Sequence, residues 1–350
     1  DVDSFLATAT DMDMFIDAVI ATADHIGAKL RQHKKLRLAF DSLEVVGAMA
    51  AAILLVAVGA LDDRYDLDSL TKLAGQTTAG GVLVIFGVAL TVFWVPWGGG
   101  GPGPISGSLL VLGPDQSVIL TVLLTVALVN AMNFVDGLDG LAAGIGMIAA
   151  AAIGLFAIGL VHRVGNDPTA YSPALIAAVL AGACLGFLPH NFNPARIFMG
   201  DSGSMLIGLL LAAATMTASG RMADTGVGPR NVVGLFAPLI VLAAVVFVPL
   251  LDLLLAVVRR TRKGMSPFTP DKMHLHHRML EIGHSHRRAV LLIYLWAAVL
   301  AFGAVALALI DDLPVVLWTT GFGLLVAVIA SAVPRERRRG VDGPAGRRAR

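Results

Sequence analysis

The sequence has a single cysteine and little charge. Cys184 is the only cysteine among 350 residues, which excludes an internal disulfide framework. Asp, Glu, Lys and Arg make up only 15% of the chain, whereas hydrophobic residues make up 56% and the mean hydropathy is +0.78. A soluble domain of this length would not carry so many apolar residues. The composition therefore predicts an integral membrane protein.

Long apolar runs account for most of the chain. A helix needs about 20 apolar residues to cross the core of a bilayer, and the polar–apolar alternation of a membrane β-barrel does not occur. We therefore expect an all-α integral membrane protein, a polytopic helical bundle of about nine transmembrane helices. The predicted spans are Val45–Ala60, Gly80–Trp97, Ser117–Phe134, Leu141–Val161, Ser172–Pro189, Ser202–Gly220, Val232–Val258, Ala289–Ile310 and Pro314–Val333.

Lys and Arg are distributed unevenly between the two sets of connecting loops. One set comprises residues 61–79, 135–140, 189–201, 259–288 and the tail from 334, and it holds 18 Lys and Arg. The opposite set, residues 98–116, 162–171, 221–231 and 311–313, holds 3. The positive-inside rule predicts that the first set is cytoplasmic. All the polar clusters described below fall in that set.

The chain divides into three parts. Residues 43–333 hold the nine spans and form the predicted membrane domain. Residues 1–42 are an atypical amino-terminal segment in which aspartates and basic residues argue against a further span. Residues 334–350 are basic and poor in apolar residues, so we expect a disordered cytoplasmic tail attracted to anionic lipid headgroups.

Two adjacent aspartates follow the first apolar run directly. The carboxyl end of a helix disfavours negative charge, so Asp62 and Asp63 predict a cation close by. Repulsion between the two carboxylates makes one of them a candidate proton acceptor. The alternative is a solvated turn in which Arg64 balances the pair.

A second cluster, NAMNFVDGLDG, follows the third apolar run. Asn130, Asn133 and Asp136 recur at steps of three, which places them on one face of a helix end, and Asp139 follows in a turn. Amide and carboxylate oxygens suit a hard cation such as Mg²⁺. DGLDG is also the sequence of an ordinary turn, so this motif alone leaves both possibilities open.

A third cluster, NPARIFMGDSGS, places Asp201 where the sixth apolar run begins. Backbone N–H groups at the start of a helix can hold phosphate oxygens. An aspartate that only caps the helix gives the same letters. Both alternatives remain open on the sequence alone.

The fourth cluster, PDKMHLHHRM, lies in the most basic loop. Its histidines His274, His276 and His277 stand among several Arg and Lys residues, which suits a polyanion such as a nucleotide diphosphate. A zinc site formed by His274, His276, His284 and His286 is one alternative, although no cysteine lies nearby, and solvated histidines are another. Asp252 is an acidic residue inside an apolar run. Such a residue has either a functional role or a structural hydrogen bond, and the sequence does not decide between them.

Taken in order, these four clusters resemble the motifs of the polyprenyl-phosphate N-acetylhexosamine-1-phosphate transferases, the MraY–WecA–TagO superfamily of glycosyltransferase family 4. The resemblance covers residues 43–333 and rests on GALDDRYDLDSLTKLAGQ, NAMNFVDGLDGLAAG, NPARIFMGDSGS and PDKMHLHHRML. The HLHH sequence is similar to the WecA-like branch. The branch that makes lipid I of peptidoglycan usually carries three consecutive histidines.

The resemblance implies an Mg²⁺-dependent enzyme, with Mn²⁺ as a possible substitute. It would transfer N-acetylglucosamine 1-phosphate from UDP-GlcNAc to undecaprenyl or decaprenyl phosphate and release UMP. The lipid product would start a cell-envelope glycan such as arabinogalactan, O-antigen or teichoic acid. The expected location is the inner (plasma) membrane of a bacterium, with the site on the cytoplasmic face, a homodimer as the expected assembly and no nucleic-acid partner.

The resemblance also implies residue roles. Metal ligands would be Asp201 and Asp136. Catalytic residues would be Asp62, Asp63, Asp136, Asp139, His274, His276 and His277, with Asp62 or Asp63 deprotonating or orienting the lipid phosphate. Substrate-binding residues would be Lys72, Asn130, Asn133, Asn193 and Arg196.

The sequence departs from the family pattern near its start. The family usually has about eleven spans and a Pro-Arg-x-Gly-Gly motif between the first two, and that motif does not occur before Asp62. On the family pattern Val45–Ala60 is the third span. The alternatives to the main hypothesis are a phospho-MurNAc-pentapeptide transferase, an inactive relative and an ion-coupled transporter.

Overall fold

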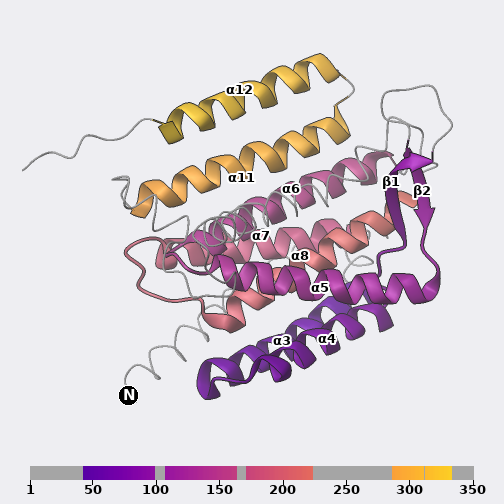
Figure 1. Cartoon of the computed structure of the whole chain (residues 1–350), viewed down its shortest axis with the longest axis vertical. Helices are drawn as coiled ribbons and strands as arrows, with labels where there is room; N and C mark the ends of the chain where they lie inside the picture. Colours follow the sequence, from indigo (N-terminus) through magenta and orange to yellow (C-terminus); the bar gives the residue numbers. More distant parts are fainter. Residues whose placement is uncertain (1–41, 99–106, 164–170, 224–285, 311, 333–350) are drawn as a thin grey trace, which may run out of the picture.

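The computed structural model describes residues 42–98, 107–163, 171–223, 286–310 and 312–332. Within these ranges the chain forms helices that run side by side and one short β-hairpin (Figure 1). The helices are α3 (Leu43–Tyr65), α4 (Ser69–Ile85), α5 (Pro114–Val135), α6 (Leu141–Arg163), α7 (Ser172–Asn191), α8 (Gly200–Ala223), α11 (His286–Leu309) and α12 (Leu313–Ala332). The strands are β1 (Val92–Gly98) and β2 (Gly107–Val111).

Seven of the described helices are long and apolar enough to cross a membrane, namely all except α4. They confirm a polytopic helical membrane protein and match seven of the nine predicted spans. The predicted span Val232–Val258 lies outside the described residues, as do residues 1–41 and 333–350. Asp252 and the histidines of PDKMHLHHRM also lie outside them.

The prediction of the second span was wrong in its bounds. The helix does not run from Gly80 to Trp97; α4 begins earlier, where Asp68 caps its first turn, and it ends at Ile85. Gly87 follows with a φ of +86°, a conformation that favours glycine. The β-branched and aromatic residues beyond it then form β1, which pairs with β2 in antiparallel register. Hydropathy alone did not distinguish this strand from a continuing helix.

The short α4 still returns the chain from one end of the bundle to the other. Its 17 residues extend about 25 Å at 1.5 Å per residue. The connection after it is held at the far end by α5, because the Leu90 N–H donates to Thr121 Oγ1 and the Leu90 carbonyl accepts from Ser117 Oγ. The hairpin therefore lies at the end of the bundle where α5 begins (Figure 1).

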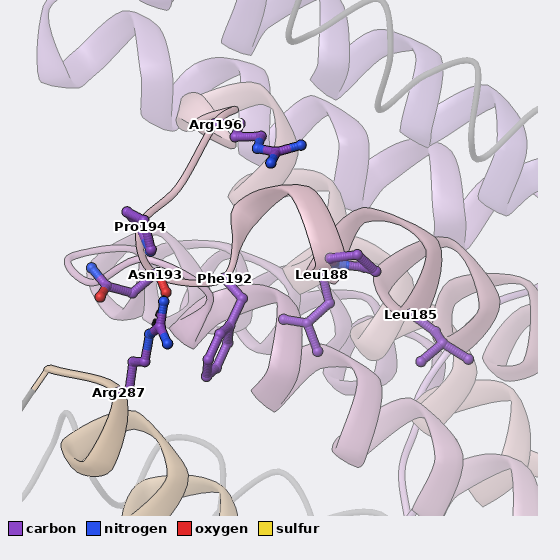
Figure 2. Close-up of a pocket in the computed structure, with 8 residues that line it drawn as sticks. Leu185, Leu188, Phe192, Asn193, Pro194, Arg196 and Arg287 are labelled. Carbon is purple, nitrogen blue, oxygen red and sulfur yellow. Dashed lines mark hydrogen bonds between the residues drawn. The ribbon is translucent and has the colours of Figure 1, made fainter.

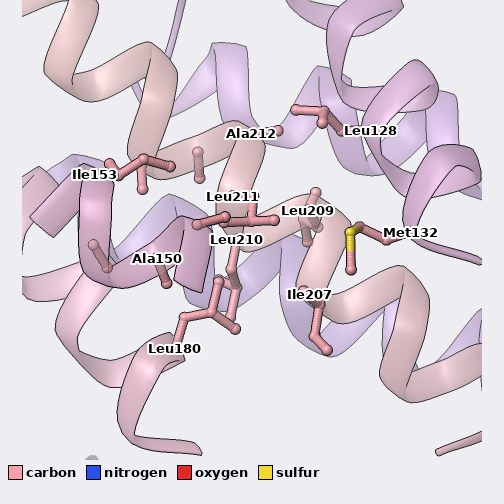
Figure 3. Packing of buried hydrophobic residues seen from close by; sticks show 14 of the residues in the cluster. Leu128, Met132, Ala150, Ile153, Leu180, Ile207, Leu209, Leu210, Leu211 and Ala212 are labelled. Atoms are coloured by element: carbon pink, nitrogen blue, oxygen red, sulfur yellow. The ribbon is translucent and has the colours of Figure 1, made fainter. Parts of the chain in front are cut away.

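Helix α8 is the centre of the described bundle. Of the residues in its apolar span, 94% are buried, whereas 11% are buried in the span of α12 at the edge of the bundle. Figure 3 shows side chains of α8 from Ile207 to Ala212 among Leu128 and Met132 of α5, Ile153 of α6 and Leu180 of α7. Two glycines let the backbones of neighbouring helices approach closely. A Cβ on Gly59 of α3 would lie 2.4 Å from the Cα of Ser202, and one on Gly208 of α8 would lie 2.6 Å from the Leu128 carbonyl oxygen.

The direction of each helix determines which ends meet. α3 and α5 end, and α4 and α8 begin, at the end of the bundle opposite the hairpin (Figure 1). α7 also ends there and α11 begins there (Figure 1). The aspartate and asparagine motifs of the sequence occupy these helix ends, so the fold brings three of the four clusters to one end.

Substitution of Gly208 by alanine tests the central packing of α8. The new methyl group has no room against the α5 backbone, so we expect a loss of about 1–3 kcal/mol in stability, as for other overpacked cores. Thermal unfolding of the purified protein in detergent measures the effect. Gly186→Ala in α7 is the matched control, because nothing lies within 4 Å of its added Cβ. Equal melting temperatures for the two variants would contradict the packing described here.

Candidate active site

Lys72 joins three helices at the end of the bundle. Its ammonium lies 2.5 Å from Asp62 Oδ2 at the end of α3 and 3.3 Å from Asp201 Oδ2 at the start of α8. The Asp62 side chain is only 3% exposed, whereas those of Lys72 and Asp201 are about a third exposed. One lysine on α4 thus neutralises charge from carboxylates of two other helices.

The predicted cation beside the aspartate pair is therefore Lys72. Asp62 is buried, so the alternative of a solvated turn is wrong for this residue. Its second carboxylate oxygen accepts a hydrogen bond from the Leu67 N–H at 2.9 Å. That contact closes the turn between α3 and α4 and sets the start of the helix that carries Lys72.

Asp63 contacts the first turn of α8 rather than Lys72. Its carboxylate accepts hydrogen bonds from the Asp201 N–H at 2.9 Å, the Ser202 N–H at 3.3 Å and the Ser202 hydroxyl at 2.7 Å. Gly200 has a φ of +66°, and a Cβ there would lie 2.9 Å from the Asp63 carboxylate. Asp63 thus caps α8 from another helix, and two of the N–H groups expected to bind phosphate are already bonded to it.

Two asparagines of α5 are held on one face of that helix, as their spacing of three predicted. Asn130 Nδ2 donates to Gln76 Oε1 of α4 at 2.6 Å, and Asn133 Nδ2 donates to Ser204 Oγ of α8 at 3.1 Å. Gln76 is buried. These bonds tie the end of α5 to α4 and α8, so the second motif shares a site with the first and third.

Asp136 stands at the carboxyl end of α5 among other acids. Its partial burial, together with the charges of Asp201, Asp63 and Asp139, raises the pKa of its carboxyl group from 3.8 to about 7. Its carboxylate accepts no hydrogen bond from the described residues. Burial near like charges without a polar partner favours a bound cation or a proton.

Asp139 holds the loop that leads into α8. Its Oδ2 accepts from Asn193 Nδ2 at 2.8 Å and from the Ala195 N–H at 3.1 Å. The buried Asn191 fixes the other side of the loop, since its amide accepts from the Gly140 N–H and donates to the Ile197 carbonyl. The loop includes a cis peptide bond between Asn193 and Pro194.

The donor set of this site fits a hard divalent cation. Carboxylate oxygens are the ligands that Mg²⁺ prefers, and Asp136 and Asp201 interact electrostatically across the site. No three acidic, histidine or cysteine side chains among the described residues converge on one point. Two carboxylates alone would supply only part of a coordination sphere, and substrate phosphates and water are the usual remaining ligands of Mg²⁺.

Arg196 and Asn193 also line a separate groove, which we name the α7–α11 groove. It measures about 700 Å³, and its walls include Leu185, Leu188, Phe192, Asn193, Arg196 and Arg287. Figure 2 shows the apolar side chains in a row along the end of α7. Arg287 reaches from α11 to the Asn193 carbonyl, to which its Nε–H donates at 2.7 Å (Figure 2).

Several residues of the site were not predicted from the sequence. Gln76 lies four residues after Lys72, which is the spacing of one helix face and was the one available signal. Ser202 and Ser204 belong to the MGDSGS motif, but their sequence positions alone indicate no role. Asn191 and Arg287 carry no local motif, so their contacts depend on tertiary structure alone.

The structure brings together most of the predicted site residues. Asp62, Lys72, Asn130, Asn133, Asp136 and Asp201, with Asp63 and Asp139 as supports, belong to the helix ends that meet at one end of the bundle. Arg196 lines the α7–α11 groove. His274, His276 and His277 lie outside the described residues, and their predicted role stays a prediction.

These helix ends, with their aspartates and single lysine, carry the motifs of a membrane sugar-phosphate transferase. The model of glycosyl transferase family 4 matches residues 45–219, and the chain belongs to this family. This confirms the family expected from the four motifs.

Several relatives have names that specify a reaction more closely than the family description does. The chain is 54% identical over 295 residues to the decaprenyl-phosphate N-acetylglucosaminephosphotransferase of Mycolicibacterium smegmatis, covering 84% of this chain and 70% of the relative. The protein of the same name from Mycobacterium tuberculosis is also 54% identical, over 290 residues, with 83% and 70% covered. The undecaprenyl-phosphate alpha-N-acetylglucosaminyl 1-phosphate transferase of Escherichia coli is 36% identical over 257 residues, with 72% and 63% covered.

The raised pKa of Asp136 predicts a pH-dependent stability in metal-free buffer. The unfolded carboxyl group ionises near pH 4 and the folded one near 7, so the folded state binds more protons in between. We therefore expect the melting temperature of the EDTA-treated protein to fall as pH rises from about 4 to about 7. Asp136→Asn should flatten that part of the profile, and Mg²⁺ should raise the melting temperature at pH 7 in the wild type only. A profile that is identical in wild type and variant would contradict the burial described for Asp136.

Removal of the Asp63 carboxylate tests its role as the cap of α8. Asp63→Ala leaves the first N–H groups of α8 without acceptors, so we expect a loss of about 1 kcal/mol, typical of a lost cap. Thermal unfolding in detergent provides the measurement. Asp66→Asn is the control: it removes an exposed carboxylate three residues away, and asparagine tolerates the left-handed φ of 52° there. An Asp63 variant as stable as this control would show that the cap contributes nothing.

Proposed function

We propose that this protein transfers N-acetylglucosamine 1-phosphate from UDP-GlcNAc to a polyprenyl phosphate. The products are UMP and a polyprenyl-diphosphate-linked N-acetylglucosamine, the first lipid-linked intermediate of a cell-envelope glycan. The observation that carries the proposal is the pairing of Lys72 with Asp62 and Asp201, which joins the first and third motifs across three helices. The names of the relatives support the same reaction, and those at 54% identity favour decaprenyl phosphate as the acceptor.

The reaction is a phosphoryl transfer between two phosphates. An oxygen of the lipid phosphate attacks the sugar-bearing phosphorus of UDP-GlcNAc. The bond from that phosphorus to the bridging oxygen breaks, and UMP leaves with that oxygen. Negative charge accumulates on the oxygens around the reacting phosphorus, so the protein contributes mainly by positioning and by cationic groups.

Asp62 is the better candidate to orient or deprotonate the lipid phosphate. The carboxylate of Asp63 already accepts three hydrogen bonds from the start of α8, so Asp63 acts as a positioning residue. Asp62 bonds to Lys72, whose ammonium is partly exposed and can also approach a phosphate oxygen. The lysine would thus bring the acceptor phosphate and the Asp62 carboxylate to the same point.

Mg²⁺, or Mn²⁺ in its place, would act as a Lewis acid that stabilises the negative charge developing on the diphosphate when bound. Asp201 and Asp136 would hold the ion. Asn133 and Ser204 fix the region around Asp201, since the Asn133 amide donates to the Ser204 hydroxyl and that hydroxyl donates to the Asp201 carbonyl. Asp139 would act through the 193–195 loop rather than at the reacting atoms.

The membrane position of the site suits its two substrates. The sugar nucleotide is soluble in water, and the phosphate of the polyprenyl lipid sits at the headgroup level. The site lies at the ends of membrane-spanning helices, where both can reach it (Figure 1). The excess of Lys and Arg in the loops at this end supports a cytoplasmic site in a bacterial plasma membrane. Assembly as a homodimer stays a prediction.

The alternative functions have less support. A transporter of this size would place its acids near the middle of broken helices, whereas the described acids of the motifs gather at helix ends. The relatives named above from Mycolicibacterium smegmatis and Escherichia coli are N-acetylglucosamine enzymes, which favours that sugar over a MurNAc-pentapeptide. The exchange assay described next distinguishes an active enzyme from an inactive relative.

Exchange of labelled UMP into UDP-GlcNAc, in the presence of decaprenyl phosphate, tests the proposal. We expect wild-type membranes to catalyse exchange and Asp201→Asn to lower it by at least about 100-fold, the scale of losing one electrostatic stabiliser of a transition state. Asp115→Asn is the control, because Asp115 is an exposed aspartate at the opposite end of α5. Unchanged exchange in the Asp201 variant would contradict the role of Asp201 as a metal ligand. No exchange in the wild type would favour an inactive relative.

A further inference from the structure

The α7–α11 groove has no part in the aspartate site described above. Its lining includes neither Lys72 nor any of the five motif aspartates. It opens beside the last two turns of α7, which is one of the candidate membrane spans. The groove therefore lies where that span ends, at the boundary between lipid and water.

The groove is apolar on one side and cationic on the other. Leu185 is 59% exposed and continues the lipid-facing surface of α7 into the groove, with Leu188 and Phe192 beyond it. Arg196 and Arg287 stand at the polar side, on either side of Pro194 (Figure 2). Within the described part of the chain, neither guanidinium forms an ion pair with a carboxylate.

Among the described residues Arg287 makes one hydrogen bond, which leaves most of its N–H donors available. Its Nε–H donates to the Asn193 carbonyl, which holds the side chain against the groove wall. A guanidinium has five N–H donors, arranged to match phosphate oxygens. The remaining donors and the exposed Arg196 can therefore bind a phosphate at the groove rim while an acyl chain lies along the leucines.

We propose that the α7–α11 groove binds an anionic phospholipid, with its phosphate on Arg196 and Arg287 and part of an acyl chain on Leu185 and Leu188. Basic pockets between transmembrane helices are typical binding sites for anionic lipid headgroups. The volume of about 700 Å³ falls in the range of pockets that hold small molecules. The Asn193 carbonyl and side-chain amide connect the bound lipid to Asp139 at the edge of the aspartate site.

Native mass spectrometry of the full chain, titrated with phosphatidylglycerol or phosphatidylcholine, tests the proposal. We expect preferential retention of phosphatidylglycerol and a loss of about tenfold in its affinity in Arg287→Gln, the scale of a hydrogen bond to a charged group. Arg288→Gln is the matched control: it removes the same charge one residue away, where the side chain bonds to the Ala330 carbonyl of α12. Leu185→Glu, which repels an anionic lipid without altering Arg287, should give the same loss as Arg287→Gln.

Each other outcome overturns the proposal. Equal retention of the two phospholipids, or equal affinity in Arg287→Gln, Leu185→Glu and Arg288→Gln, would show that the groove does not select an anionic lipid. Displacement of phosphatidylglycerol by inorganic phosphate at millimolar concentration would assign the rim to free phosphate. One-for-one displacement by decaprenyl phosphate, lost in Arg287→Gln, would assign the groove to the acceptor lipid instead.

Discussion

The ammonium group of Lys72 holds together helix ends that would otherwise repel one another. Asp62 lies at the carboxyl end of α3, where the helix dipole disfavours an anion, and it is buried. Asp201 faces it from the start of α8. An uncompensated buried carboxylate would destabilise this end of the bundle by several kcal/mol. The lysine offsets part of that cost and, since its side chain is 29% exposed, leaves a cationic group at the surface of this end of the bundle.

The buried helix α8 gives this pairing a fixed geometry. Close contacts at Gly59 and Gly208 set its distance from α3 and α5. Asp63 then caps its first turn, which leaves the side chain of Asp201 directed to Lys72. The site is thus assembled by packing and capping before any substrate binds. Such preorganisation is what phosphoryl transfer requires, because its catalysis is mostly positioning and electrostatics.

The sequence predicted the helical membrane fold and the gathering of the motifs well, because both depend on local patterns. Apolar length identifies spans, and the spacing of three in Asn130, Asn133 and Asp136 indicates a shared helix face. The sequence did not separate the roles of Asp62 and Asp63. Adjacent residues on a helix point about 100° apart, so one faces Lys72 and the other α8, and which is which depends on tertiary packing.

Other differences have equally physical reasons. The second span was placed too late because hydropathy does not register the left-handed turn at Gly87 or the hairpin beyond it. Gln76 and Arg287 act through partners far away in the sequence, on α5 and in the 193–195 loop. A single sequence carries no signal for such pairs, whereas the motif aspartates are visible because acids are rare at the ends of apolar helices.

In the proposed reaction a sugar phosphate, not a sugar alone, moves to a lipid phosphate. The most direct measurement uses UDP-GlcNAc labelled with ³²P at the sugar-bearing phosphorus and with ¹⁴C in the sugar, incubated with the protein, decaprenyl phosphate and Mg²⁺. We expect both labels to enter the lipid fraction in the starting ratio, with release of unlabelled UMP. Transfer of ¹⁴C without ³²P would show that the bond between the sugar and its phosphate breaks instead, and it would rule out transfer of a sugar phosphate.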